Sequence, residues 1–197
     1  MNSLLALIAA TSVLVMIPGP NVALIVANGL KYGFRMGAAT VVGTTLGVAL
    51  QLLLVVFGLT VVIAMAADVL TWVKWAGVVY LLYLGILTWR EPADELTSVE
   101  AAPVMFWRGC LVALLNPKTL LFNAAFIPQF ISGESATAAG IGLVAAVYLA
   151  VLFLGDLLWA VFASSARHVI ERFGRLRNRL TGAFLASAGV GLALSRH

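Results

Sequence analysis

Long apolar stretches alternate with short polar segments along the whole chain. The apolar stretches cover residues 3–30, 37–65, 70–89, 107–131, 138–165 and 181–195. A helix needs about 20 predominantly apolar residues to cross the hydrocarbon core of a bilayer. The last stretch is shorter than the others, and we interpret it as a short final span. The pattern therefore predicts an all-α membrane protein with six transmembrane helices, forming a single polytopic domain over residues 1–197.

Two of the predicted spans contain proline within their apolar core. The first contains Pro18-Gly19-Pro20-Asn21, and the fourth contains Asn116-Pro117-Lys118. Proline breaks a helix, and irregular backbone at membrane depth survives only where it is buried in protein or lines a cavity. Because six spans divide into three and three, we predict two inverted three-helix halves, residues 1–90 and 106–197, each opening with a broken helix. Broken helices at matched positions indicate a transporter's binding site.

The polar segments predict how the chain is oriented. Nine of the twelve lysines and arginines fall in the first, third and fifth connections, and the third includes the polar loop 91–105. The positive-inside rule therefore predicts that these connections are cytoplasmic and that both termini face outward. Residues 167–180 combine five arginines with apolar residues at helical spacing. This pattern predicts an amphipathic helix on the inner leaflet that binds anionic lipid; a solvated basic loop is the alternative.

Composition excludes several classes of protein. The chain is 62% hydrophobic and 10% charged, with a mean hydropathy of +1.07, whereas a soluble domain is about 25% charged. The net charge of +4 fits basic cytoplasmic loops, so we expect no nucleic-acid partner. The single cysteine, Cys110, argues against a disulfide framework and a dithiol relay. No nucleophile–base pair, phosphate loop or metal-ligand spacing is visible, so we expect neither an enzyme nor a cofactor.

Several polar residues are expected to converge near the middle of the membrane. At a rise of 1.5 Å per residue they lie roughly 11–16 Å from the cytoplasmic ends of their spans. Lys118 and Asp156 are the clear intramembrane base and acid, and such charges pair or face water. We predict that they face one another or share a wet cavity; a pair that only fixes helix packing is the alternative. The candidate substrate-binding and coupling residues are Pro18, Gly19, Pro20, Asn21, Thr44, Thr45, Asn116, Pro117, Lys118 and Asp156.

The remaining polar and glycine residues are expected to serve packing. The amides that we expect to bridge helices are Asn28, Gln51, Asn123 and Gln129. The glycines of the second span, Gly37, Gly43 and Gly47, are expected to permit close approach of helices.

The proline and glycine motifs together resemble a known family. Pro18-Gly19-Pro20-Asn21, the stretch Gly37 to Gly47, the stretch Tyr80 to Gly85 and Asn116-Pro117-Lys118 occur in the order seen in the LysE/RhtB amino-acid exporters. Asp156, followed by Trp159, also resembles the family pattern. The resemblance implies a bacterial inner-membrane secondary exporter that expels amino acids by proton antiport, and it implies a homo-oligomer. Cadmium, a cargo of more distant relatives, is disfavoured because soft metals prefer thiolates.

The expected mechanism and cargo follow from that resemblance together with the charges. The start of the half-helix after Pro20 suits a cargo carboxylate, which Lys118 would assist, and Asp156 suits the ammonium group. Protonation of Asp156 would then compete with cargo. With one intramembrane acid, a neutral amino acid such as threonine, homoserine or leucine is favoured over a basic one. An uncoupled membrane channel or assembly protein, or an exporter of basic amino acids, is the alternative.

Overall fold

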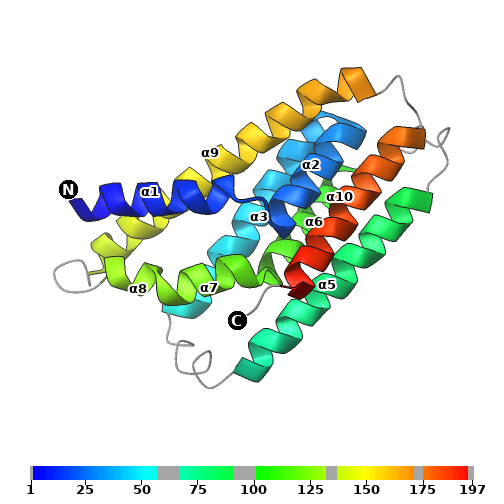
Figure 1. The fold of residues 1–197 in the computed structure, drawn as a ribbon. Coiled ribbons are helices and arrows are strands. Elements are labelled where there is room, and N and C mark those ends of the chain that lie inside the picture. The colour runs from blue at the N-terminus through cyan, green and yellow to red at the C-terminus, as the bar shows by residue number, and fades with distance from the viewer. Residues whose placement is uncertain (1, 57–66, 91–100, 132–136, 171–174, 195–197) are drawn as a thin grey trace.

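The computed structural model describes residues 2–56, 67–90, 101–131, 137–170 and 175–194, and it is all-helical there (Figure 1). The predicted all-α class is therefore confirmed for the described residues. The helices are α1 (Asn2–Met16), α2 (Pro20–Tyr32), α3 (Phe34–Leu54), α5 (Ala67–Arg90), α6 (Ala102–Leu114), α7 (Pro117–Ala125), α8 (Ile127–Phe130), α9 (Ala138–Ile170) and α10 (Arg175–Leu194).

The first predicted span is broken at the predicted place. Its two segments, α1 and α2, meet at an angle of 58°. Pro18 and Pro20 cannot donate the backbone hydrogen bonds that would continue α1, and a residue before proline is pushed to extended backbone. Gly19 accordingly has φ −139° and ψ −169°, and Pro20 begins α2, a position where the fixed φ of proline fits a helix.

The fourth predicted span breaks in the same way. The segments α6 and α7–α8 meet at 54°. Asn116 is extended, with φ −84° and ψ 104°, and Pro117 is the first residue of α7. Each break thus consists of an extended residue followed by a proline that starts a new helix. The two breaks that the sequence predicted are confirmed.

Helix length and hydropathy identify a multi-pass membrane protein. Among the described residues, α3 and α9 are long and apolar enough to cross a membrane alone, and each bent pair would add one span, which gives up to four. A shorter apolar helix covers Arg179–Leu194. Residues 57–65 of the second predicted span lie outside the described residues. The predicted number of six spans is therefore not established by this count.

The outer surface is apolar, as a lipid-facing surface must be. Large hydrophobic side chains stand exposed on several helices, among them Trp72 on α5, Leu158 and Phe162 on α9, and Leu194 on α10. Contiguous exposed apolar surface of this kind marks a membrane or protein contact in a folded chain.

Glycines of α3 permit close contact with α6, as predicted. A Cβ atom added to Gly47 would lie 2.5 Å from the Cys110 carbonyl oxygen, and one added to Gly43 would overlap the Phe106 carbonyl. Gly109 of α6 reciprocates, since its Cβ would lie 2.5 Å from the Thr40 carbonyl oxygen. Small residues let helix backbones approach in this way in membranes. The tight pair places α3 next to both halves of the fourth span.

The remaining helices surround this centre. Figure 1 shows α5 and α10 side by side at one edge of the bundle, whereas α9 and α1 lie at the other. The basic stretch 167–180 is divided between the end of α9 and the start of α10, and residues 171–174 lie outside the described residues. The predicted loop 91–105 also lies largely outside them, with α6 beginning at Ala102.

Candidate functional site

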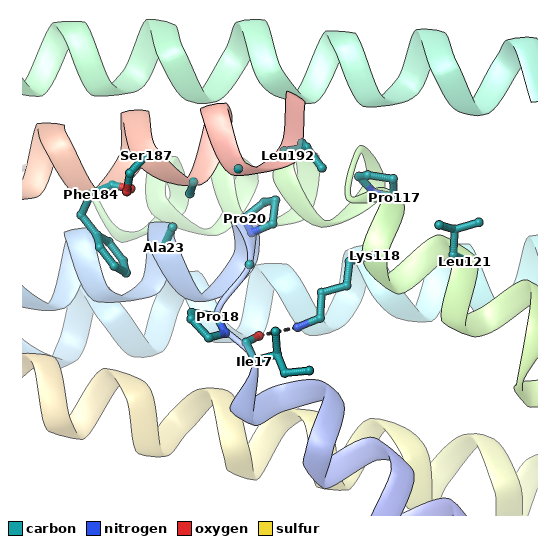
Figure 2. A pocket seen from close by; sticks show the side chains of 13 residues that line it. Ile17, Pro18, Pro20, Ala23, Pro117, Lys118, Leu121, Phe184, Ser187 and Leu192 are labelled. Carbon is teal, nitrogen blue, oxygen red and sulfur yellow. Dashed lines mark hydrogen bonds between the residues drawn. The ribbon is translucent and has the colours of Figure 1, made fainter. Parts of the chain in front are cut away.

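At the first break, side chains from other helices donate hydrogen bonds to the carbonyl groups at the end of α1. Pro18 has no N–H, so the Leu14 carbonyl lacks its normal donor four residues later. The Lys118 ammonium group takes that place, since Nζ donates to the Leu14 carbonyl oxygen at 2.5 Å. Nζ also donates to the Ile17 carbonyl oxygen (Figure 2). Trp159 Nε1 donates to the Val15 carbonyl at 3.2 Å. Lys118 is therefore a cap of the α1 half-helix.

The amide end of the first break has no side-chain cap. Gly19 occupies the N-cap position of α2 and has no side chain that could accept from the first-turn N–H groups. Within the helix, the N–H groups of Asn21 and Val22 have no partner, because the first turn of any helix lacks one. Both residues line a small cavity of about 20 Å³. The positive end of the α2 dipole therefore faces this cavity.

Asp156 lies in the same small cavity. Its side chain is buried, with 6% of its surface exposed, and Thr44 Oγ1 donates to Oδ2 at 3.4 Å. Lys118 also lines the cavity, but among the described residues no ion pair joins it to Asp156. A volume of about 20 Å³ is enough for about one water molecule. The base and the acid therefore share a cavity without direct contact.

The second break is closed by neutral amides. Asn116 caps its own helix, since its Oδ1 accepts from the Lys118 backbone N–H at 3.0 Å. Pro117 has no N–H to donate to the Ala113 carbonyl, which accepts from the Asn116 N–H at 3.1 Å instead. Gln51 Nε2 also donates to that carbonyl at 2.8 Å and to the Leu114 carbonyl at 3.2 Å. The second break therefore has a side-chain cap at both helix ends.

A direct hydrogen bond joins the two breaks. Asn116 Nδ2 donates to Asn21 Oδ1 at 2.9 Å, and both side chains are buried. The motifs Pro18-Gly19-Pro20-Asn21 and Asn116-Pro117-Lys118 thus come together, although Asn21 and Asn116 lie 95 residues apart in the sequence. This contact places the candidate residues Pro18, Gly19, Pro20, Asn21, Asn116, Pro117 and Lys118 around one point.

Of the two candidate threonines, only Thr44 contacts Asp156 in the described part of the chain. Thr45 Oγ1 donates to the Val41 carbonyl of its own helix at 2.9 Å, and neither threonine is among the residues that line the small cavity. Thr44 also donates to the Val41 carbonyl, at 3.0 Å, but its Oγ1 lies within reach of Asp156. One helical position separates the threonine that contacts the acid from the one that does not.

The predicted bridging amides behave differently from one another. Asn28 Nδ2 joins α2 to α3 by donating to Thr40 Oγ1 at 2.8 Å. Asn123 Nδ2 donates to Gln51 Oε1 at 3.3 Å, and Asn123 Oδ1 is buried without a partner in the described part of the chain. Gln129 donates to the Ala125 carbonyl of the preceding turn. The capping role of Gln51 was missed, although a glutamine inside an apolar span was its signal.

A second, larger cavity adjoins the first break and contains residues that sequence reasoning missed. It has a volume of about 560 Å³ and is lined by the linker between α1 and α2, by the start of α7 and by α10. Figure 2 shows Phe184, Ser187 and Leu192 of α10 around it, together with Pro18, Pro20 and Lys118. Gly19 and Lys118 line both cavities. They therefore form the partition between the two.

The described residues contain no group of three or more histidine, cysteine, aspartate or glutamate side chains that could hold a metal ion. Cys110 is buried.

Known proteins resemble this chain over nearly its whole length. It is 29% identical to the membrane protein YrhP of Bacillus subtilis (strain 168), over 99% of this chain and all of the relative. It is 26% identical to a homoserine/homoserine lactone efflux protein of Salmonella typhi, over 98% of this chain and 96% of the relative. It is 27% identical to a leucine efflux protein of Klebsiella pneumoniae, over 98% and 90%. No solved structure matches.

A family model described as LysE type translocator matches residues 12–196, and the order of motifs around the two breaks resembles the same family. The chain therefore belongs to the LysE family of translocators.

Proposed function

We propose that this protein is a secondary exporter that moves neutral amino acids across the bacterial inner membrane in exchange for protons. The observation that carries the proposal is the first break, where an uncapped helix start, a lysine and a buried aspartate surround one cavity. Relatives named as efflux proteins for leucine and for homoserine support the cargo class.

The charges at the first break suit both ends of a zwitterion. A cargo carboxylate would accept from the first-turn N–H groups of α2, where the helix dipole is positive. An ammonium group has three N–H donors, and Lys118 uses two of them on the Leu14 and Ile17 carbonyls. The third is available to the same carboxylate. Asp156 would accept from the cargo ammonium group.

Coupling to protons follows from the double role of Asp156. Its carboxylate holds either a proton or the cargo ammonium group, so binding of one releases the other. Thr44 would stabilise the charged form by turning its one hydroxyl hydrogen from the Val41 carbonyl to Oδ2. Because a buried charge without a partner is costly in a membrane, the protein is expected to change sides only with one of the two bound. Such a restriction makes the protein exchange cargo for protons, which is antiport.

The small cavity is too small for an amino acid, so binding requires movement at the breaks. Pro18, Pro20 and Pro117 interrupt the backbone hydrogen bonds of two helices, and they are the proposed hinges together with the glycines of α3. Similar bends of 58° and 54° support two inverted three-helix halves. We further propose six spans with both termini outward, anionic lipid at residues 167–180, and a homo-oligomer.

The test is a flux measurement with purified protein in liposomes. We would impose a pH gradient and follow labelled leucine, threonine and lysine, with wild type and Asp156→Asn in parallel. We expect gradient-driven movement of a neutral amino acid, and we expect the substitution to lower it roughly 10- to 100-fold. Movement of lysine alone would overturn the neutral cargo class. Gradient-independent flux through folded protein would replace the exporter with an uncoupled channel.

A further inference from the structure

The chemical character of the larger cavity bears on which amino acids the protein transports. We propose that it receives the side chain of the transported amino acid and that α10 restricts this side chain to an uncharged, apolar type. The inference rests on the proposed function, because it takes the first break as the site for the cargo's charged groups.

The position of the cavity supports this assignment. Gly19 and Lys118 line both the small polar cavity and the larger one. A cargo whose carboxylate lies at the start of α2 and at Lys118 therefore has its side chain next to the larger cavity. That cavity has a volume of about 560 Å³, within the usual range for small-molecule sites of about 300–1,000 Å³.

The lining of the cavity favours apolar side chains. It is formed chiefly by hydrophobic residues, including Ala23 of α2, Leu121 of α7 and Phe184 of α10. Ser187 donates its hydroxyl to the Phe184 carbonyl at 2.8 Å, so its hydrogen atom is already used. None of the lining residues is acidic, and the one that is charged, Lys118, is a cation. A lysine or arginine side chain would meet a like charge there without a counter-ion.

A groove of similar volume elsewhere in the protein is lined by neither Gly19 nor Lys118. An apolar groove of about 610 Å³ lies between α1 and α9, and none of the residues that line it carries a charge. It has the character of a lipid-facing groove. The cavity at α10 differs because it reaches Gly19 and Lys118 at the break.

Two glycines offer a matched pair of variants for testing cargo size. Gly191 lines the larger cavity, and a Cβ atom added there would meet nothing within 4 Å. Gly142 of α9 is equally open and is not among the residues that line the cavity. Leucine at either position is therefore compatible with the fold, but only Gly191→Leu fills cavity space.

The first experiment measures flux of labelled leucine and labelled alanine into liposomes under one imposed pH gradient. Gly191→Leu is expected to raise KM for leucine by roughly tenfold relative to its effect on alanine, since pocket size discriminates by such factors. Gly142→Leu is expected to leave the KM values for leucine and for alanine unchanged. Equal effects of Gly191→Leu on the two cargoes, or equal effects of the two variants, would overturn the inference and would favour a lipid acyl chain as the occupant.

The second experiment changes the charge of the cavity. Ser187→Asp adds an acid to the α10 side of the cavity, and Ser165→Asp places the same residue at an exposed position of α9 as a control. Transport of labelled lysine is expected to rise roughly tenfold or more with Ser187→Asp, since a partner for the cationic side chain is created. An unchanged ratio of lysine to leucine flux would overturn the role of α10. Failure of the wild type to move any amino acid would instead contradict the proposed function.

Discussion

The two helix breaks share a backbone design but differ in how their ends are satisfied. Each has an extended residue followed by proline, and at each a side chain donates to carbonyl groups at the end of the preceding helix. At the second break, neutral amides close both ends, with Asn116 on the N–H side and Gln51 on the carbonyl side. At the first, the carbonyls depend on a charged side chain, Lys118, and the helix start at Gly19 has no cap.

The difference supports the proposal that the first break binds cargo and that the second has a structural role. A helix start capped by its own side chain has little capacity left for a ligand, whereas an uncapped one at membrane depth requires a partner. The buried acid lies in the cavity at the uncapped break. Gln51 thus ties the second break to α3, and these differences support our proposal that cargo binds at the first break.

The largest expected effect comes from the acid at the first break. Asp156→Asn keeps the size of the side chain but removes its charge, so gradient-driven export should fall roughly 10- to 100-fold, as expected for loss of a charged hydrogen-bond partner. Liposome flux measures this. Tyr148→Phe is the control on the same helix, because the Tyr148 hydroxyl is buried without a partner in the described part of the chain. Equal losses in both variants would contradict the assignment.

The next comparison replaces the N-cap residue of each of the two helix starts by alanine. Asn116→Ala removes the cap of α7 and should lower the free energy of unfolding by about 1–2 kcal/mol. Gly19→Ala removes no cap. Its Cβ would approach Lys118 Cδ to 3.2 Å, so it should weaken cargo binding more than stability. Thermal unfolding in detergent and leucine binding measure the two effects. A larger loss of stability in Gly19→Ala would contradict the distinction.

A smaller effect is expected from the second donor at the carbonyl end of the first break. Trp159→Phe removes the bond from Nε1 to the Val15 carbonyl while keeping most of the ring. The free energy of unfolding should fall by about 0.5–1.5 kcal/mol, the usual net value of one hydrogen bond. Thermal unfolding in detergent would measure it. An unchanged unfolding temperature would show that this carbonyl needs no protein donor.

The smallest effect is expected from the neighbouring threonines. Thr44→Val removes a long hydrogen bond to Asp156, and export should fall roughly twofold to fivefold. Thr45→Val removes only a bond within its own helix and should leave transport unchanged. Flux measured at equal amounts of inserted protein decides between them. A greater loss with Thr45→Val would contradict the proposed role of the contact between Thr44 and Asp156.

The sequence predicted the features that depend on local chemistry. Proline inside an apolar span predicted both breaks, because the missing N–H acts on its own helix. Glycine spacing predicted the close contact of α3 with α6. The depth of Lys118 and Asp156 predicted that they would share a layer, since residue count along a helix gives depth.

The sequence did not predict features that depend on how a helix is turned about its axis or on which helices pack beside it. Depth does not say which face of α3 is turned inward, so Thr44 and Thr45 appeared equivalent. Lys118 and Asp156 line one cavity, but the sequence did not indicate that the Leu14 and Ile17 carbonyl groups bind the Lys118 ammonium group. The cavity at α10 was missed because Ser187 and Gly191 line it only together with residues of other helices, whose packing the sequence does not show.

The most direct test of the difference between the breaks is equilibrium binding of labelled leucine to purified Lys118→Met and Gln51→Met. Both variants replace a side chain that caps half-helix carbonyls by one of similar length, so thermal unfolding should show comparable losses of stability. The account predicts that Lys118→Met loses leucine binding, whereas Gln51→Met binds leucine as the wild type does. Leucine binding lost through Gln51→Met and kept by Lys118→Met would place the site at the second break and contradict the account.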